Sequence, residues 1–118
     1  MSAPRFVILQ HDYPSLHFDL MLEEAESLRT WRLPTPPQAG ITIKGEVSFP
    51  HRLAYLDYEG PVGGGRGQVL CWDRGIYTVV SASDALVEVH CQGQKLRGTL
   101  YLLHRAGNDW DVTYTPDA

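Results

Sequence analysis

The stretch FVILQHDYPSLHFDLMLE, residues 6–23, contains the pattern that decides the fold. The run VIL at 7–9 favours an extended backbone, and the YPS segment at 13–15 then interrupts the apolar run. Strand-forming residues resume at 17–23 as HFDLMLE. The stretch therefore predicts two β-strands joined by a short turn.

The second predicted strand carries different side chains on its two faces. Successive residues of an extended strand point to opposite sides, so every second residue shares a face, at a spacing of about 6–7 Å. One face is apolar and suits a core; it consists of Phe18, Leu20 and Leu22. The other face places the imidazole of His17 beside the carboxylate of Asp19, followed by Met21.

A metal site is one interpretation of this polar face. His11 ends the first predicted strand, so it can fold back across the turn toward His17 and Asp19. Two neutral imidazoles and one carboxylate that converge on a point suit Mn²⁺, Zn²⁺ or Fe²⁺. The alternative is structural, because a single histidine is more often a surface or core residue and His-x-Asp arises often by chance. The three residues alone leave both interpretations open.

Length and composition indicate one globular domain covering residues 1–118. The chain has 118 residues, of which 43% are hydrophobic and 20% charged, enough for one core and too few for two. No apolar run approaches the roughly 18 residues of a membrane span, and the N-terminus lacks the basic and apolar segments of a signal peptide. We therefore expect a cytoplasmic protein with no membrane partner.

The charge balance argues against a protein that wraps DNA through a basic surface. Ten Lys and Arg residues stand against fourteen Asp and Glu residues, a formal net charge of −4. An enzyme that processes nucleic-acid ends is still compatible with this balance, since its phosphate contacts can be few and local. Most of the basic residues are Arg, a bias that suits bidentate phosphate contacts and also ordinary surface usage.

Alternating apolar and polar residues predict further strands along the rest of the chain. They lie at residues 28–33, 41–47, 68–72, 76–81, 85–91, 96–105 and 109–115. Glycine-containing segments at 73–75, 92–94 and 106–108 predict hairpin turns between the later strands. Short strands with tight turns predict an all-β fold, a small closed or partly open antiparallel β-barrel with one or two short helical turns.

Two segments and two cysteines fit this pattern less simply. Residues 49–59 lack a period of two and have Pro50 where a helix can begin, so they predict a short helical turn or an ordered loop. The glycine-rich residues 60–67 predict a loop that either lets the backbone approach a ligand or merely connects strands. Cys71 and Cys91 belong to no Cys-x-x-Cys pair, so we expect buried free thiols, with a disulfide as the alternative.

Several motifs follow one another in a recognisable order. Residues 11–23 read His-x5-His-Phe-Asp-Leu-x-Leu-Glu, after an apolar strand. The later motifs are LRTWRLP at 28–34, HRLAYLDYEG at 51–60, GRGQVLCWDRG at 65–75 and GQKLRG at 93–98. Together they resemble the 3′-phosphoesterase domain found at one end of bacterial DNA ligase D and also as a free-standing protein. The resemblance covers nearly the whole chain.

The resemblance implies a function and assigns roles to residues. It implies that His11, His17 and Asp19 bind a divalent metal, typically Mn²⁺, with Zn²⁺ or Co²⁺ as alternatives. His51 would contact the scissile phosphate, and Tyr55 would help to set the site. The family trims 3′ ends of DNA or RNA-tipped primer strands during break repair, removing a terminal ribonucleoside and then the remaining phosphate. The implied partners are nucleic-acid 3′ ends in primer-template DNA, and a DNA ligase or end-joining factor.

The chain departs from the family pattern near the predicted site. Met21 stands where the family usually has an arginine, two residues after the metal-binding aspartate, and we expect Arg52 or Arg66 to supply the missing phosphate contact. The pair LQ at 9–10 replaces the Gln-Lys pair that often precedes the first histidine. Because only five residues precede Phe6, we expect the family's polar N-terminal arm to be absent. These departures favour removal of a simple 3′-phosphate over full diesterase activity.

Two other functions stay open at this point. A phosphoesterase-like barrel that has lost catalysis and only binds nucleic-acid ends or a repair partner fits Met21 and the acidic balance. A non-haem iron oxygenase also uses two histidines and a carboxylate, although such enzymes generally need a longer fold. Outside the matched motifs, we expect His90 and His104 at the surface or in packing, and the three tryptophans in the core.

Overall fold

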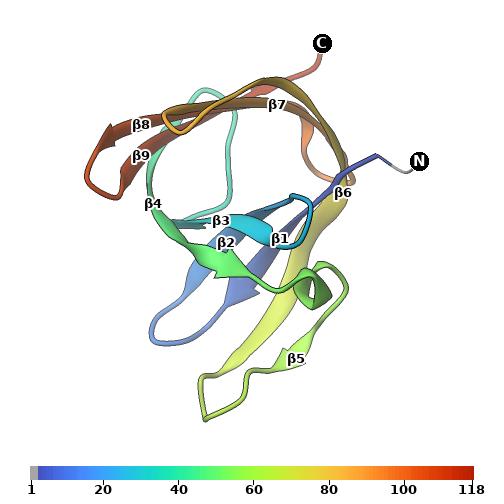
Figure 1. Cartoon of the computed structure of the whole chain (residues 1–118), viewed down its shortest axis with the longest axis vertical. Helices are drawn as coiled ribbons and strands as arrows, with labels where there is room; N and C mark the ends of the chain where they lie inside the picture. Colours follow the sequence, from blue (N-terminus) through green and yellow to red (C-terminus); the bar gives the residue numbers. More distant parts are fainter. Residues whose placement is uncertain (1–2) are drawn as a thin grey trace.

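Eight antiparallel strands close into a barrel in the computed structural model, which describes residues 3–118 (Figure 1). Around the barrel the order is β1-β2-β3-β4-β9-β8-β7-β6, and pairing of β6 with β1 completes the circle. These strands are β1 (Arg5–His11), β2 (His17–Glu23), β3 (Leu28–Leu33), β4 (Thr42–His51), β6 (Gln68–Ala82), β7 (Leu86–Gly93), β8 (Arg97–Ala106) and β9 (Asp109–Pro116). The predicted all-β barrel is confirmed, and the barrel is closed.

The segment from 52 to 67, here called the flap, crosses the outer face of the barrel next to β1. It contains a 3₁₀ helix, η1 (Leu53–Leu56), and a two-residue strand, β5 (Gly60–Pro61), which pairs with the start of β6. The backbone N–H of Cys71 donates to the Glu59 carboxylate and ties the flap to β6. No helix within residues 3–118 is long and apolar enough to cross a membrane.

The structure of residues 49–61 differs in part from the prediction of a helical turn followed by a loop. A short helical turn does form, at η1, but residues 49–51 extend β4 instead of joining it. The reason is strand pairing, because His51 lies opposite Leu28 of β3. Residues 60–61 likewise form a strand where only a loop was expected, since they meet residues 68–69 across a tight glycine turn.

The opening hairpin forms as predicted and separates two sets of side chains. β1 and β2 are in register from Phe6 opposite Leu22 to His11 opposite His17. The barrel interior receives Phe18, Leu20 and Leu22 from β2. Met21 packs instead into a second, outer cluster with Val7, Leu9, Leu28, Leu56 and Val69, beneath the flap. The alternation of β2 therefore builds two cores on opposite sides of one sheet.

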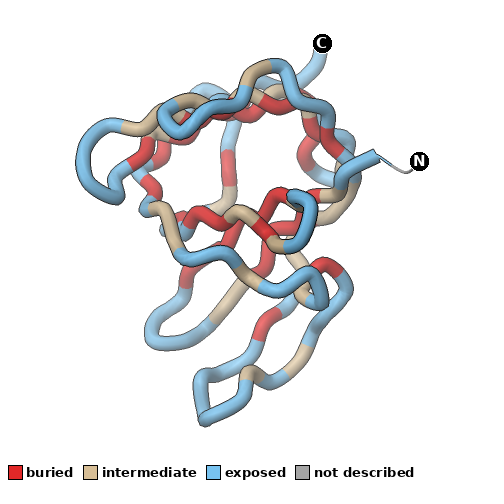
Figure 2. Tube along the Cα trace, in the orientation of Figure 1, coloured by how far each residue is buried: buried red, intermediate tan, exposed pale blue. Residues whose placement is uncertain are grey.

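The larger core fills the barrel. Figure 2 shows buried residues along the strands that enclose the barrel, whereas the tip of the flap is exposed. Trp31 and Trp110 meet edge to face inside it with ring centroids 5.4 Å apart, and Trp72 packs against the same cluster. The prediction that the tryptophans belong to the core is confirmed.

The prediction of a hairpin turn at residues 73–75 is wrong. β6 runs without interruption from Gln68 to Ala82, pairing with β1 over its first half and with β7 over its second. Gly75 lies where both neighbours meet: a Cβ there would be 2.0 Å from the carbonyl oxygen of Gln92, so only glycine allows this approach. The Asp-x-Gly sequence thus marks closure of the barrel, a contact between distant segments, and not a local turn.

Asp73 explains why its motif reads Trp-Asp-x-Gly. Its carboxylate is buried and accepts hydrogen bonds from the backbone N–H groups of Gln94, Lys95 and Leu96, at 2.8–3.1 Å. A Cβ on Gly93 would lie 2.4 Å from the same carboxylate. The motifs at 65–75 and 93–98 therefore contact each other through Asp73 and Gly93, and this contact holds the β7–β8 hairpin against β6.

Both cysteines are free thiols, but the prediction that both are buried is wrong for Cys71. Cys91 lies in the barrel core with no exposed surface, whereas Cys71 is partly exposed. Burial raises the pKa of the Cys91 thiol to about 12, and the Asp73 charge adds to this effect. Cys91 is therefore protonated and unreactive in the folded protein.

Replacing Asp73 tests the barrel-closing contact. Asp73→Ala leaves three backbone N–H groups without their acceptor, so we expect the free energy of unfolding to fall by about 2–4 kcal/mol in urea titrations. Asp84→Ala, in the exposed β6–β7 turn, is the matched control and should change it little. Equal effects of the two substitutions would contradict this account of the motif.

Thiol reactivity tests the position of Cys91. Because its pKa is about 12, fewer than about one thiol in a thousand is ionised at pH 8, and thiolate is the reactive form. We expect one rapidly reacting thiol per folded chain with 5,5′-dithiobis(2-nitrobenzoate), assigned to Cys71 by Cys71→Ser, and two after denaturation. Two equally fast thiols in the folded protein would show that the barrel core is open.

Candidate metal centre

The first hairpin places His11, His17 and Asp19 together on the outer face of the barrel. His11 ends β1 and His17 begins β2, and the two residues are directly opposite each other in the antiparallel ladder. Asp19 lies two residues further along β2, so its side chain points to the same side. The juxtaposition predicted from the turn is therefore present.

The ligand atoms of these three residues converge. Nε2 of His17 lies 3.3 Å from Oδ2 of Asp19, and Nδ1 of His11 lies 3.9 Å from the same oxygen. One atom from each residue falls within 4.8 Å of the others. The two imidazole rings approach edge to face, with centroids 4.9 Å apart. One cation can therefore contact all three side chains.

Backbone carbonyl groups orient both histidines for this role. Nε2 of His11 lies 2.8 Å from the carbonyl oxygen of Arg66, and Nδ1 of His17 lies 2.9 Å from that of Ser15. Because a carbonyl oxygen only accepts, each of these nitrogens must carry the proton. The remaining nitrogens, Nδ1 of His11 and Nε2 of His17, then present lone pairs toward Asp19. Metal-binding histidines are commonly fixed by such partners.

Two atoms of the cluster are buried without a hydrogen-bond partner among residues 3–118. They are Nε2 of His17 and Oδ1 of Asp19. Unsatisfied buried polar atoms are costly. A cation bound between the imidazoles and Oδ2 of Asp19 would satisfy the Nε2 lone pair of His17 and neutralise the carboxylate, whose Oδ1 faces Arg32. The donor set of two nitrogens and one carboxylate fits Mn²⁺, Zn²⁺, Fe²⁺ or Co²⁺, and three protein ligands leave positions for substrate.

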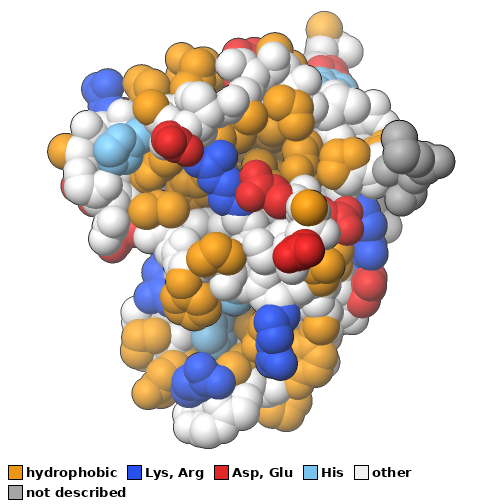
Figure 3. Space-filling model, in the orientation of Figure 1, with side chains coloured by type: hydrophobic (Ala, Val, Ile, Leu, Met, Phe, Trp, Pro, Cys, Tyr) orange, Lys and Arg blue, Asp and Glu red, His pale blue; other side chains and the backbone are white. Residues whose placement is uncertain are grey.

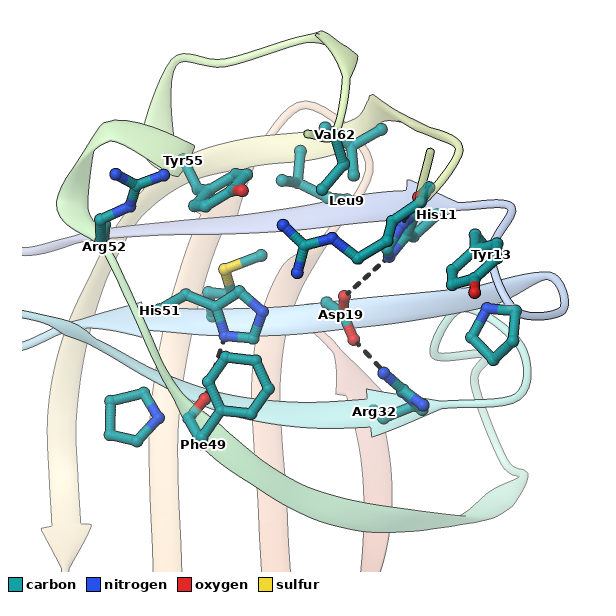
Figure 4. A pocket seen from close by; sticks show the side chains of 15 residues that line it. Leu9, His11, Tyr13, Asp19, Arg32, Phe49, His51, Arg52, Tyr55 and Val62 are labelled. Carbon is teal, nitrogen blue, oxygen red and sulfur yellow. Dashed lines mark hydrogen bonds and ion pairs between the residues drawn. The ribbon is translucent and has the colours of Figure 1, made fainter. Parts of the chain in front are cut away.

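A cavity of about 400 Å³ opens beside the cluster, between the barrel wall and the flap (Figure 4). Its lining is Leu9, His11, Tyr13, Pro14, Asp19, Met21, Arg32, Phe49, Pro50, His51, Arg52, Tyr55, Val62, Arg66 and Val69. In the space-filling view, basic and apolar side chains border a recessed histidine in the lower part of the molecule, where the flap lies (Figure 3). Positive charge thus gathers locally in an acidic chain.

His51 reaches this cavity from the end of β4. Its Nδ1 donates to the carbonyl oxygen of Phe49 at 3.0 Å, and its ring stacks on the Phe49 ring, with centroids 4.6 Å apart. The ring of Tyr55, in η1, packs edge to face against the His51 ring, with centroids 5.8 Å apart. Burial lowers the pKa of His51, and the Asp19 carboxylate opposes this in part. The neutral ring therefore presents an accepting Nε2, and it donates from that atom only after protonation.

Arg52 and Arg66 both line the cavity but have other partners. The guanidinium of Arg52 lies 6.0 Å from the centre of the Tyr55 ring. Nε of Arg66 donates to the carbonyl oxygen of Gly63 at 2.7 Å, and the Arg66 carbonyl orients His11. Phosphate binding by either arginine stays a prediction.

The Arg66 carbonyl is held in place by Gly67. Gly67 has a φ of +70°, and a Cβ there would lie 2.1 Å from Oδ1 of Asp12. That oxygen accepts the backbone N–H of Gln68 at 2.8 Å, which ties the flap to the β1–β2 turn. The glycine-rich segment is thus fastened to the site, and a close approach of its backbone to a ligand stays a prediction.

Arg32 and Phe49 were missed by sequence reasoning. Arg32 lies directly opposite Asp19 in the β2–β3 ladder, with Nε 3.9 Å from Oδ1 of Asp19. Counting back from the 24–27 turn would have revealed this pair, since Glu23 lies opposite Leu28. Phe49 is 68% exposed at the cavity rim, and no sequence pattern marks it.

The departures from the family pattern meet in the same cavity. Leu9 and Met21, at which the resemblance leads us to expect polar residues, both line it, together with Val62 and Val69. One side of the cavity is therefore apolar, while Asp19 and the histidines form the other.

Comparisons with known proteins agree with the motifs. The sequence model of the DNA Ligase D 3′-phosphoesterase domain matches residues 9–105. The multifunctional non-homologous end joining protein LigD of Pseudomonas aeruginosa is 32% identical over 109 residues, covering 84% of this chain and 13% of that protein. LigD of Mycobacterium bovis is 28% identical over 114 residues, covering 89% of this chain and 15% of its own length. The chain thus spans a small fraction of these relatives.

The match includes the positions of His11, His17, Asp19 and His51, and it extends through the motif pair that closes the barrel. On this evidence, the chain belongs to the DNA ligase D 3′-phosphoesterase domain family.

Proposed function

We propose that this protein is a metal-dependent phosphoesterase that processes 3′ ends of nucleic acid during DNA repair, with a 3′-phosphate as its preferred substrate. The observation that supports it most is the orientation of two imidazoles toward a buried carboxylate that lacks a hydrogen-bond partner. Family membership supports the same reaction class and disfavours the iron oxygenase.

Each residue has a task in this proposal. His11, His17 and Asp19 would hold the divalent ion, most simply Mn²⁺, with Zn²⁺ or Co²⁺ as alternatives. A bound cation supplies charge neutralisation and a lowered pKa of water at the phosphate. His51, when protonated, would donate from Nε2 to a non-bridging oxygen or to the leaving alkoxide. Tyr55 would hold the His51 ring in position.

The partners proposed are primer-template 3′ ends and, in the cytoplasm, a DNA ligase or end-joining factor. The relatives named for non-homologous end joining support this setting. Because Met21 and Leu9 make one side of the cavity apolar, removal of a terminal phosphate is favoured over cleavage of a ribonucleoside diester.

The same apolar side favours a second candidate, a module that binds 3′ ends without turnover. A charged phosphate contact can stabilise the transition state more than it stabilises the bound 3′ end. Its loss would then reduce turnover more than it reduces binding of that end. Tight binding of a 3′-phosphorylated duplex, with no phosphate released in Mn²⁺, would select this alternative.

Phosphate release from a 3′-phosphorylated primer-template tests the proposal. We expect Mn²⁺-dependent release by the wild-type protein and a loss of more than about 100-fold in His17→Ala, because a metal ligand is removed. His104→Ala is the matched control, since that ring lies against Gly107 and Trp110 near the distant β8–β9 turn. Equal activity of His17→Ala and wild type would exclude the proposed metal centre.

Gly67→Ala tests the link between the flap and the metal site. A Cβ at this position collides with Asp12 and displaces the Arg66 carbonyl from His11, so Mn²⁺ affinity should fall by about 10–100-fold. Gly63→Ala, where a Cβ meets nothing within 4 Å, should leave the affinity unchanged. Titration of free Mn²⁺ by electron paramagnetic resonance measures both; equal affinities would show that the Arg66 carbonyl does not orient His11.

A further inference from the structure

Arg32 is a third arginine at the cavity, and it borders the metal cluster. Cross-strand pairing with Asp19 brings it to the outer face of β3, where its side chain is 43% exposed. Figure 4 shows Asp19 between His11 and Arg32, with His51 at the same opening. The carboxylate therefore has two sides: Oδ2 faces the imidazoles, and Oδ1 faces the guanidinium.

The guanidinium of Arg32 forms a long ion pair with Asp19 and keeps its hydrogen-bonding capacity. Among the described residues it makes no hydrogen bond, and its approach to Oδ1 of Asp19, at 3.9 Å, is too long for one. Arg52 lies over Tyr55, and Arg66 donates to Gly63. Among the described residues, Arg32 is the pocket arginine within ion-pair distance of Asp19, so its charge is held next to the candidate metal ligands while its N–H groups make no hydrogen bond.

Met21 lies next to Asp19 on the outer face of β2, so Arg32 is the arginine that approaches this part of the site from the neighbouring strand. Met21 and Asp19 are on the same face of β2, and their partners on β3 are Thr30 and Arg32. No charged side chain stands on this face at the position of Met21, but a guanidinium reaches the same carboxylate from the neighbouring strand. An anion at the cluster also needs a positive group to offset repulsion by Asp19, and a guanidinium suits phosphate oxygens.

We propose that Arg32 is the phosphate-binding residue of this site and contacts a non-bridging oxygen of the phosphoryl group held beside Asp19. Arg32 is thus an alternative to Arg52 and Arg66, which stay predicted as the source of the missing phosphate contact. It rests on the proposed function only for the identity of the anion, because the position of the guanidinium beside Asp19 follows from the pairing of β2 with β3.

Binding of inorganic phosphate to the Mn²⁺-loaded protein tests the inference without catalysis. By isothermal titration calorimetry, Arg32→Ala should weaken phosphate binding at least about tenfold, and Arg32→Lys should bind with intermediate affinity. Mn²⁺ affinity, measured separately, should stay within about twofold in both variants. Arg105→Ala, which removes an exposed arginine paired with Asp111 on the distant β8–β9 hairpin, is the control for net charge.

Three results would overturn the inference. They are unchanged phosphate affinity in Arg32→Ala, a loss confined to Arg66→Ala or Arg52→Ala, and a parallel loss of Mn²⁺ affinity in both Arg32 variants. The last would make Arg32 a positioning residue for Asp19. If the wild-type protein binds phosphate through Arg32 but releases none from a 3′-phosphorylated end, this inference stands and the proposed enzymatic function fails.

Kinetics separate the role further where turnover is present. If Arg32 holds the phosphoryl group in both the ground state and the transition state, Arg32→Ala should raise KM and lower kcat/KM. The dependence of activity on Mn²⁺ concentration should stay unchanged. A fall in kcat at unchanged KM and phosphate affinity would contradict ground-state phosphate binding.

Discussion

The register of the first hairpin is the constraint on which the rest of the structure depends. With His11 opposite His17, the apolar residues of β2 enter the barrel, while His17 and Asp19 face the outer side under the flap. A slip of one residue would turn every side chain of the strand to the other face, placing the imidazole and carboxylate in the apolar interior. Folding of the barrel therefore brings His11, His17 and Asp19 together. The same strand, β2, supplies residues of the barrel core and residues of the candidate metal site.

The outer face is completed by contacts from distant parts of the chain. Carbonyl groups of Ser15 and Arg66 set the proton positions of the two histidines, and β4 delivers His51 from the opposite edge of the cavity. Several motif residues act on this frame instead of on a ligand: Asp73 fastens the β7–β8 hairpin, and Glu59 fastens the flap. In this chain, these two motif residues therefore stabilise the barrel and the flap.

Sequence reasoning succeeded where the determinants were local. Alternation within β2 and the short turn at 12–16 were enough to predict the two faces of the hairpin and the convergence of its histidines. It failed where distant strands decide the outcome. Asp73 and Gly75 read as a turn because their real partners, at 92–96, are invisible without the closed barrel. Arg32 was overlooked because its importance comes from the strand beside it, and the extension of β4 to His51 depends on pairing with β3.

Anomalous scattering from a crystal soaked in Mn²⁺ is the most direct measurement of the central idea. The account predicts one strong peak at the first hairpin, roughly 2 Å from Nδ1 of His11, Nε2 of His17 and a carboxylate oxygen of Asp19. A peak elsewhere, or side chains of these residues turned away from one another in the soaked crystal, would contradict it.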